Sequence, residues 1–467
     1  MKPIISAFCL ILINLSTIAQ VDSAFAFGLQ QQLDGIRSSS SIAGMEVTLI
    51  FDSGCELSLT SGVQTGSTPI DTSKLWHVAS NTKSLTATVI MLMQEDGLLD
   101  IDDPVGLYIN TNNWSGIDSN LTIRSILSHT SILGNAWYDG SPLWTAIWGD
   151  RDSLWNERDV FLPQFQVPTA NPNGDFEYNA FTGYTLLGFM IEEISGNAYA
   201  DEVATRIFTP MGLSRSKLSN EGVSMSELNG VWSGGQDRST WSHTSYLSTR
   251  GGGGSWCTIL RESARYFHTL HFGSVLSPLS MAETRMKVDQ TPQIVPGTAL
   301  GSFEINYGLG SWIWTSRSAS DTIVFYGHGG NGLGSVIVAA CPEYGFTMAV
   351  VSNDFTKVNE NSLALITMSD YVIDNMNSQT CQNVSTPEFE AISRFTVYPN
   401  PGANLLTLES TVNESSKYQV MTLDGKILLT GEFNGSKRLD VSNLSSGMYI
   451  VKFVAGEEVH TVRWVKE

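Results

Sequence analysis

The stretch Trp76-His77-Val78-Ala79-Ser80-Asn81-Thr82-Lys83-Ser84 opens a strongly helical segment that runs to about Gly97. Residues three apart on a helix share a face, so the amine of Lys83 is expected beside the hydroxyl of Ser80. A serine hydroxyl is a weak nucleophile unless a base lies next to it. The free N–H groups and partial positive charge of a helix N-terminus also suit an oxyanion. The stretch therefore predicts a serine hydrolase that forms a covalent intermediate.

A second Ser-x-x-Lys pattern, at Ser214 and Lys217, lacks the apolar periodicity that follows Ser80. We interpret this second copy as a surface loop. The competing interpretation of Ser80 is a helix cap, with Lys83 solvated in the first turn, because short motifs often occur by chance. After Ser80, apolar residues at helical spacing predict one buried helix face: Leu85, Val89, Ile90, Leu92 and Met93.

Several blocks in the same order resemble the serine β-lactamase and penicillin-binding protein superfamily, in its class C, D-peptidase and esterase-like branch. Together they cover about residues 28 to 375. Besides the nucleophile segment they are Gly44–Phe51, Leu57–Ser61, Glu95–Val105, Ile123–Ser131, Tyr307–Gly310 and Gly327–Gly330. The resemblance implies an α+β fold, in which helices flank an antiparallel sheet built from the first and last parts of the catalytic region. It also implies a helical subdomain over about residues 105 to 250.

The second motif of this superfamily is Tyr-x-Asn, and Tyr178 falls where the family tyrosine falls. The resemblance implies that Tyr178 passes a proton between the serine and the leaving group. Position 180 is alanine, where the family has an asparagine that orients the substrate carbonyl and the lysine. Asn179 takes over this substrate-binding role if the loop is shifted by one residue. The alternative for Tyr178 is a half-buried aromatic residue without a catalytic role.

The third motif is Lys-Thr-Gly on an edge strand, replaced in many peptidase and esterase members by His-x-Gly. Here the sequence is His328-Gly329-Gly330-Asn331, and small residues at 329 and 330 let a substrate lie against the strand. By analogy, the N–H groups of Ser80 and Asn331 form the oxyanion hole beside Gly330. His328 is expected to contact a substrate carboxylate or to polarise Tyr178. An imidazole is a weaker cation than lysine at neutral pH, which favours a peptidase or esterase over a dedicated β-lactamase.

The remaining conspicuous residues are interpreted as structural. In the resemblance His129 caps a helix beneath the site, and His77 is predicted to be a strand residue. No pair of histidines or acidic residues has metal-ligand spacing, so we expect no metal and no cofactor. An aromatic run favours core packing first and a rim of the cleft second: Trp137, Tyr138, Trp144, Trp148 and Trp155.

Charge and the N-terminus both indicate export. The net charge of −20 over 467 residues argues against nucleic acid or an anionic membrane as a partner. Residues 1–19 combine a positive start, a short apolar run and small residues before Gln20, which predicts a signal peptide; no other stretch predicts a transmembrane segment. After its removal an even number of cysteines remains, with three pairings open: Cys55, Cys257, Cys341 and Cys381.

The end of the chain is predicted to be a separate domain. Residues 376–394 are polar and are interpreted as a linker, and short β-branched and aromatic runs over 395–467 predict a small β-sandwich. The tail resembles the C-terminal sorting domain recognised by the type IX secretion system, on Val397–Pro401, Asp424-Gly425-Lys426 and Leu444–Val451. This implies the type IX machinery as a partner and a route through the periplasm to the cell surface or medium. The alternative is an accessory module that binds carbohydrate.

Taken together, these features predict a secreted serine hydrolase that acts through an acyl-enzyme on an amide, peptide or ester bond. The substrate classes left open are D-amino-acid peptides, esters and β-lactams. The alternative, prompted by Ala180, is a non-catalytic binding protein that keeps the fold; a second is a surface adhesin. The predicted catalytic residues are Ser80, Lys83, Tyr178 and His328, and the predicted substrate-binding residues are Asn179, Gly330 and Asn331.

Overall fold

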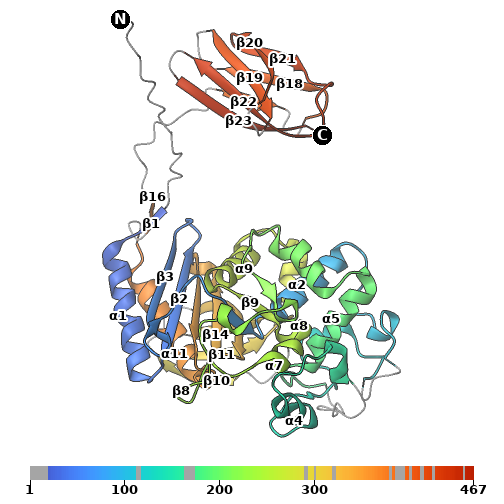
Figure 1. Ribbon diagram of the computed structural model, residues 1–467, viewed down its shortest axis with the longest axis vertical. Helices are drawn as coiled ribbons and strands as arrows, with labels where there is room; N and C mark the ends of the chain where they lie inside the picture. The colour runs from blue at the N-terminus through green and yellow to red at the C-terminus, as the bar shows by residue number, and fades with distance from the viewer. Residues whose placement is uncertain are drawn as a thin grey trace, which may run out of the picture. The chain divides into compact units, whose positions relative to one another are not determined.

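A computed structural model divides the chain into two compact units, Met1–Val384 and Ser385–Glu467 (Figure 1). The expected signal peptide lies outside the described residues except for Ala19. The structure describes residues 19–111, 117–161, 174–288, 293–298, 301–317, 322–377, 381–383, 395–398, 402–410, 415–422, 426–455 and 458–466.

A nine-stranded antiparallel sheet forms the centre of the described part of the first unit. Its strand order is β10-β11-β12-β13-β14-β15-β2-β3-β4, so the last strands of the unit pair with the first. The joint is β15 against β2, with Phe346 opposite Phe51. This confirms the expected sheet. Its strands are β2 Gly44–Phe51, β3 Glu56–Thr65, β4 Thr68–Pro69, β10 Gln293–Thr298, β11 Gly301–Tyr307, β12 Trp312–Arg317, β13 Thr322–Asn331, β14 Ser335–Cys341 and β15 Phe346–Ser352.

The central strands are buried on both faces, because helices cover the sheet on each side. Along β15, Met348 and Val350 belong to one apolar core, and Ala349 and Val351 to the other. This alternation follows from the two-residue period of a strand. The first core is closed by α1 (Ser23–Ser39) and α11 (Val358–Asn375), and the second by α9 (Leu260–Phe272) (Figure 1).

The helical subdomain expected over about residues 105 to 250 is present and packs around α2. No helix in the described parts of the chain is long and apolar enough to cross a membrane. The helices of this region and its surroundings are α2 Thr82–Glu95, α3 Ile123–Leu127, α4 Pro142–Gly149, α5 Thr182–Ser195, α6 Tyr199–Val203, α7 Thr244–Ser248, α8 Gly251–Gly254 and α10 Pro278–Thr284. Short strands connect them: β5 Trp76–Ala79, β6 Lys217–Leu218, β7 Trp232–Ser233, β8 Gln236–Asp237 and β9 Trp256–Thr258.

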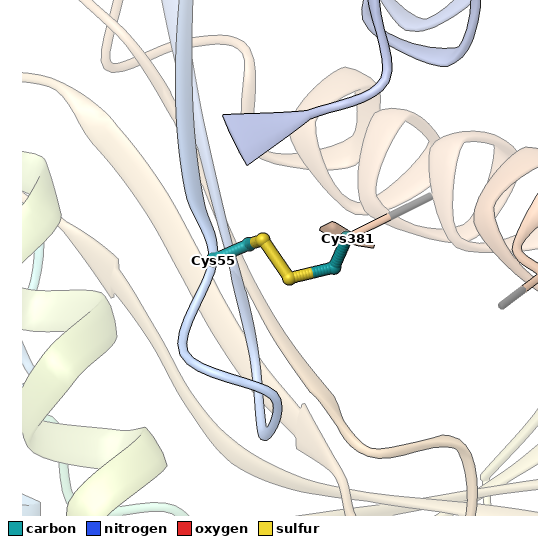
Figure 2. Close-up of a disulfide and its surroundings, with 2 residues drawn as sticks. All are labelled: Cys55 and Cys381. Carbon is teal, nitrogen blue, oxygen red and sulfur yellow. A yellow bond between two sulfur atoms is a disulfide. The ribbon is translucent and has the colours of Figure 1, made fainter. Parts of the chain in front are cut away.

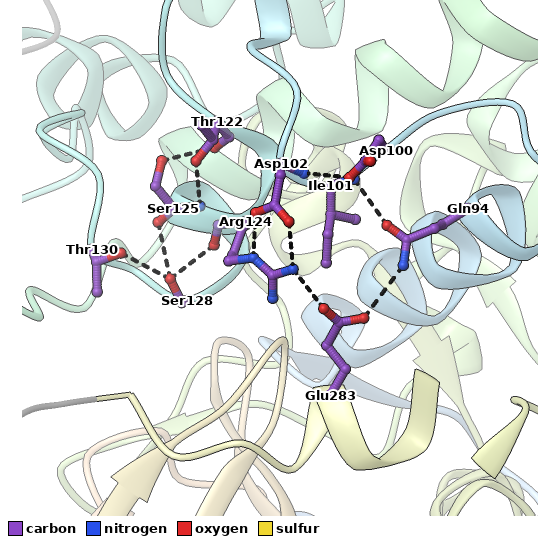
Figure 3. Close-up of polar contacts among 10 residues, drawn as sticks. All are labelled: Gln94, Asp100, Ile101, Asp102, Thr122, Arg124, Ser125, Ser128, Thr130 and Glu283. Carbon is purple, nitrogen blue, oxygen red and sulfur yellow. Dashed lines mark hydrogen bonds and ion pairs between the residues drawn. The ribbon is translucent and has the colours of Figure 1, made fainter. Parts of the chain in front are cut away.

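Arg124 of α3 fixes the C-terminal end of α2 to the segments beside it (Figure 3). Its guanidinium donates to both oxygens of Asp102, at 2.6 and 2.9 Å, and to Glu283 of α10 at 2.5 Å. Gln94 of α2 donates to Glu283 at 3.4 Å and accepts from the N–H of Ile101 at 2.9 Å. A paired guanidinium–carboxylate contact fixes direction as well as distance. These contacts hold the C-terminal end of α2 in place, whereas Ser80 lies just before its N-terminal end.

Cys55 and Cys381 form a disulfide, with Cα atoms 5.8 Å apart (Figure 2). This selects one of the pairings left open, and Cys257 and Cys341 are buried thiols. Beside the disulfide, β16 (Cys381–Asn383) pairs with β1 (Ala19–Val21). Part of the segment interpreted as a linker is thus a strand bound to the first unit, because the disulfide anchors it there.

The second unit is the expected small β-sandwich. Its sheets have the orders β17-β18-β21 and β20-β19-β22-β23, and they share one apolar core, in which Phe395 stacks on Phe453 at 4.7 Å. The β19–β20 hairpin is present, while its predicted turn at Asp424-Gly425 lies outside the described residues. Polar β21 was not predicted. The strands are β17 Phe395–Tyr398, β18 Leu405–Ser410, β19 Ser416–Thr422, β20 Ile427–Phe433, β21 Ser436–Asp440, β22 Gly447–Ala455 and β23 Glu458–Lys466.

Peptide mapping without reductant should yield one cross-linked peptide pair, between Cys55 and Cys381. Cys257 and Cys341 should react with iodoacetamide only after denaturation, because burial raises the pKa of both thiols, that of Cys341 to about 12. The Cys55→Ser variant should lose the cross-link and expose a reactive Cys381. A native cross-link that includes Cys257 or Cys341 would contradict this pairing.

Candidate active site

Ser80 lies at the junction between β5 and α2, just before the first helical residue. Ala79 ahead of it has a φ of 45°, in the left-handed region that costs a non-glycine residue on the order of 1–3 kcal/mol. The hydroxyl of Thr82 holds this turn, because it donates to the Ala79 carbonyl at 2.6 Å and accepts from the N–H of Trp256 at 2.9 Å. The strained junction leaves Ser80 half-buried at the wall of a cavity.

The amine of Lys83 is fully buried and contacts three oxygens. Its Nζ lies 3.1 Å from Ser80 Oγ, 2.7 Å from the Ala180 carbonyl and 2.8 Å from the Gly253 carbonyl. The structure therefore brings together the serine and lysine that the sequence paired. By contrast, Ser214 lies in an exposed turn and Lys217 pairs with Glu227, so the second Ser-x-x-Lys is a surface feature.

Burial lowers the pKa of Lys83 well below its ordinary value, and the nearby charge of Arg250 lowers it further. Arg250 is also buried, with its guanidinium 4.1 Å from the ring centre of Trp137 and 4.2 Å from that of Tyr246. Within the described parts of the chain, no carboxylate pairs with Lys83 or Arg250. Because a guanidinium keeps its proton, the lysine is the group whose charged form is disfavoured by this arrangement.

A neutral amine has two N–H groups and one lone pair. The carbonyls of Ala180 and Gly253 can only accept, so they take both N–H groups of Lys83. In that neutral form, the lone pair would face the hydroxyl oxygen of Ser80, which lies 3.1 Å from Lys83 Nζ. This is the arrangement that a general base needs to take the serine proton.

Tyr178 stands on the other side of the serine, and a hydrogen bond joins the two side chains. Its ring stacks on Trp312, with ring centres 5.4 Å apart, and Lys83 Nζ lies 5.4 Å from the Tyr178 ring centre. Burial raises the pKa of Tyr178 above its ordinary value of 10, although the bond to Ser80 lowers it in part. Tyr178 is therefore a phenol at neutral pH, suited to donate a proton rather than to take the first one.

At position 180, where the family has an asparagine, a backbone carbonyl takes the place of the asparagine side chain as a contact for Lys83. The carbonyl of Ala180 contacts Lys83, which is the lysine-orienting part of the role that an asparagine side chain would have there. Asn179 is not brought to the cavity. Its amide donates to the carbonyls of Leu133 and Gly134, at 2.9 Å each, and its oxygen accepts from the N–H groups of 181 and 183. These bonds occupy the side chain, so Asn179 fixes the loop and the start of α5.

The structure buries His328 completely instead of presenting it to the cavity. Nδ1 lies 2.6 Å from the Gly329 carbonyl and must donate to it, so Nε2 accepts from the hydroxyl of Tyr307 at 3.0 Å. Burial, and then the charge of Lys83, lower the pKa of His328 to about 3. The side chain is neutral and covered, which corrects the expected contact with a substrate carboxylate. Its ring centre is 6.3 Å from that of Tyr178.

Residues 328–331 form a locally free strand edge inside a strand that is otherwise paired on both sides. β12 pairs with β13 only as far as Gly327, whereas β14 continues to pair up to Asn331. An extended substrate can therefore lie along the free edge. A Cβ at Gly330 would come within 2.2 Å of the Val78 carbonyl, while at Gly329 the nearest atom would be 3.8 Å away. Gly330 lets β13 approach β5, and Gly329 opens to the cavity.

The cavity at Ser80 has a volume of about 460 Å³ and is lined by both polar and apolar residues. Gly330 and Asn331 line it together with Ser80, and His328 does not. The apolar wall comes from β11, β12, β14 and α11: Ile305, Trp312, Trp314, Ile337 and Val358.

Two further histidines have structural contacts, and His77 is the strand residue that was expected. His77 lies in β5, with Nε2 2.7 Å from the Gly254 carbonyl. His129 follows α3 with a φ of 59°, and its Nδ1 accepts from the N–H of Asn179 at 3.1 Å. The aromatic run divides: Trp137, Trp144 and Trp148 line the cleft, Trp155 packs against the core, and Tyr138 is exposed.

Sequence reasoning missed Arg250 and Gly253, which set the state of Lys83. The available signal was the run Gly251-Gly252-Gly253-Gly254, which is unusual inside a helix because glycine weakens one. Here the glycines allow close packing: a Cβ at Gly252 would lie 2.4 Å from the Tyr184 carbonyl, and one at Gly253 2.9 Å from the Phe181 carbonyl.

Comparison with protein-family models matches residues 30–368 to the model described as Beta-lactamase. The chain belongs to the β-lactamase family. Residues 396–467 match the model described as Secretion system C-terminal sorting domain, and this domain indicates a secreted or cell-surface protein. The family and the sorting tail expected from the sequence are thus both confirmed.

Curated relatives of this β-lactamase-family chain include two proteins of Bacillus subtilis (strain 168). Penicillin-binding protein 4* is 32% identical over 160 residues, 33% of each chain, and the putative penicillin-binding protein PbpX is 30% identical over 142 residues, 30% of this chain and 32% of that one. The matched part spans about a third of the length of these relatives.

Solved structures show the same fold. The D-amino acid amidase from Ochrobactrum anthropi SV3, complexed with D-phenylalanine, has a TM-score of 0.61 and 21% identity, over 76% of this chain and 100% of that one. The D-stereospecific amidohydrolase from Streptomyces sp. has a TM-score of 0.59 and 22% identity, over 74% of this chain and 97% of that one.

The glycines at 329 and 330 should tolerate substitution very differently. Gly330→Ala should abolish acylation and lower the melting temperature, since its Cβ collides with the Val78 carbonyl. The matched control Gly329→Ala adds the same methyl group where the nearest atom is 3.8 Å away, and it should fold normally. Thermal unfolding and labelling with a fluorophosphonate measure both effects. Equal stability and labelling of the two variants would contradict the close approach of β13 to β5.

The acylation rate with a neutral ester should show no step caused by His328 or His77. The pKa of His328 and that of His77 lie at about 3, so these imidazoles are already neutral between pH 5 and 8. The rate should instead rise as the pH increases through the lowered pKa of Lys83, far below the ordinary value of about 10.4. A step near pH 6.5 that disappears in His328→Gln would show that this histidine titrates at the site.

Proposed function

We propose that this protein is a secreted serine hydrolase that cleaves an amide, peptide or ester bond through an acyl-enzyme on Ser80. The observation that carries the proposal is the buried amine of Lys83, 3.1 Å from Ser80 Oγ, with both N–H groups taken by carbonyls. A merely structural lysine would be expected to keep its proton and a charged partner.

In the proposed first step Ser80 Oγ attacks the substrate carbonyl carbon, and its proton passes to Lys83 Nζ. The negative oxygen is held by the N–H groups of Ser80 and Asn331, which line the same cavity. Loss of one such donor typically costs about 10²–10³ in rate. The intermediate then collapses: the bond to the leaving group breaks, and that group takes a proton from Lys83 through the phenol of Tyr178.

The second step releases the acyl group. A water molecule attacks the ester carbonyl of acylated Ser80, and its proton passes to the neutral amine of Lys83. The ester bond breaks, the proton returns to Ser80 Oγ, and a carboxylic acid leaves. The same base serves both steps, because each step begins with a neutral amine facing the reacting oxygen.

We infer that amides, peptides or esters are better substrates than β-lactams. His328 is neutral and buried, and Gly329 has no hydroxyl, so this part of the strand offers neither a cation nor a hydroxyl to a β-lactam carboxylate. The names of two fold neighbours, a D-amino acid amidase and a D-stereospecific amidohydrolase, support D-amino-acid amides as a first class to test.

The rival proposal is a binding protein that keeps the fold and does not hydrolyse its ligand. Ala180 suggests it, because the family has an asparagine at this position. The contact of the Ala180 carbonyl with Lys83 weakens that motivation, because the lysine keeps an oriented acceptor. The non-catalytic alternative would bind ligands at the cleft and form no covalent adduct.

Intact-protein mass spectrometry after treatment with a fluorophosphonate and with a fluorescent penicillin tests the proposal. The wild-type protein should gain one adduct on Ser80, and Ser80→Ala should remain folded without an adduct, since a cap-type serine contributes only about 1 kcal/mol. Ser214→Ala is the matched control and should label fully. Hydrolysis of D-phenylalanine amide and p-nitrophenyl acetate should exceed that of nitrocefin. Labelling that persists in Ser80→Ala would refute the assignment.

A further inference from the structure

A second cavity, of about 620 Å³, adjoins the Ser80 cavity. Trp137 and Asn331 line both, so the two cavities are lobes of one cleft. We call the second one the arginine lobe. The lining residues that define it here are Trp148, Arg151, Arg238, Trp241, His243 and Tyr246.

Two positive charges meet in the arginine lobe, and neither has an ion-pair partner among the residues that the structure describes. The guanidinium carbons of Arg151 and Arg238 lie 3.9 and 4.2 Å from the ring centre of Trp241. Arg238 donates to the side chain of Gln236, and in the described parts of the chain neither arginine forms an ion pair, even though Asp139 also lines the lobe. In a chain with a net charge of −20, this gathering of unpaired cations is a local exception.

The lobe also offers N–H donors with no acceptor. Arg238 Nε and Trp148 Nε1 are buried and lack a hydrogen-bond partner among the described residues. His243 is 3% exposed. Burial lowers its pKa to about 4, with the charge of Arg151 adding to the effect and the Arg238 backbone opposing it, so the ring is neutral at pH 7. A carboxylate would supply acceptors to these donors and balance the two arginines.

We propose that the arginine lobe binds a carboxylate carried by the substrate, on an apolar or aromatic group that lies against the tryptophan rings. The inference rests on the proposed function, which places the scissile carbonyl at Ser80. One substituent of that carbonyl then occupies the apolar Ser80 cavity, and the other passes Asn331 into the arginine lobe. The arginine lobe would thus recognise a carboxylate away from His328 and away from the segment His328–Asn331 of β13, where the third family motif lies.

Binding is tested without catalysis on the full-length Ser80→Ala protein. Calorimetric titration should show hippurate binding at least about tenfold more tightly than neutral hippuramide, the range expected for charge-assisted hydrogen bonds. Adding Arg151→Met and Arg238→Met should weaken hippurate binding roughly tenfold to a hundredfold. The control Arg158→Met removes a surface arginine that pairs with Glu192 and Glu193, and should leave hippurate affinity unchanged.

If the double variant does not fold, Arg151→Gln replaces it, with an expected loss of roughly tenfold because the charge is removed and the N–H donors remain. Equal affinities for hippurate and hippuramide would overturn the inference. So would an unchanged hippurate affinity in a folded arginine variant.

Kinetics on the active enzyme then assign the substituent. The ratio of kcat/KM for phenyl hydrogen glutarate over phenyl valerate reports a carboxylate in the acyl group. The ratio for 3-carboxyphenyl acetate over phenyl acetate reports one in the leaving group. One ratio should fall roughly tenfold to a hundredfold in the double variant and stay constant in Arg158→Met. Hydrolysis of the esters with no preference for a carboxylate in either ratio would overturn only the carboxylate site proposed for the arginine lobe. Hippurate binding without any ester hydrolysis would count only against the proposed function.

Discussion

The candidate active site depends on two buried basic side chains, Lys83 and Arg250, that pair with no carboxylate in the described parts of the chain. Burying a charge without a partner is costly, and the cost falls when one group gives up its proton. Arg250 keeps its charge, lying over aromatic rings and donating to the Tyr246 carbonyl at 3.1 Å. Burial and the charge of Arg250 therefore lower the pKa of Lys83 well below its ordinary value. An acidic partner would have favoured the ammonium form, so the lack of a paired carboxylate among the described residues favours the neutral amine that the proposed mechanism requires.

The surrounding fold is arranged to keep the lysine in this state and to bring a substrate to it. The glycines of α8 allow the Gly253 carbonyl to reach Nζ, and the turn at Ala79 places Ser80 on the other side. β13 continues beyond the last residue that pairs with β12. The final residues of β13 therefore have a free backbone edge beside Ser80. His328 supports this edge from beneath through Tyr307, as a packing residue. β5, α2 and β13 thus position Ser80, Lys83 and Asn331, whereas Tyr178 lies in a loop and stacks on Trp312.

Local patterns in the sequence were enough to predict the fold, the serine–lysine pair and the sorting tail. Those features depend on short ordered motifs, and their spacing carries the information. The orientation and burial of the His328 side chain were not predictable, since a histidine between small residues can turn to either face of a strand. The role of Asn179 was equally ambiguous, because the carbonyls that accept from its side-chain amide belong to residues about 45 positions away.

The most consequential residues were also the least visible in the sequence. Gly253 reaches Lys83 across a separation of 170 residues, and the disulfide joins positions 326 residues apart. Tertiary contacts of this range leave no local periodicity. The one hint was four consecutive glycines, which make a poor helix by propensity and therefore suggest close packing.

The most direct test of the account is the pKa of Lys83 itself. In protein labelled with ¹³C-lysine, the ε-methylene signals can be followed by NMR as a function of pH, and the signal missing from Lys83→Met is that of Lys83. The account predicts that this signal titrates well below the value of about 10.4 shared by exposed lysines. A Lys83 signal that titrates with the exposed lysines would contradict it, because the amine would then be an ammonium at neutral pH and could not take the serine proton.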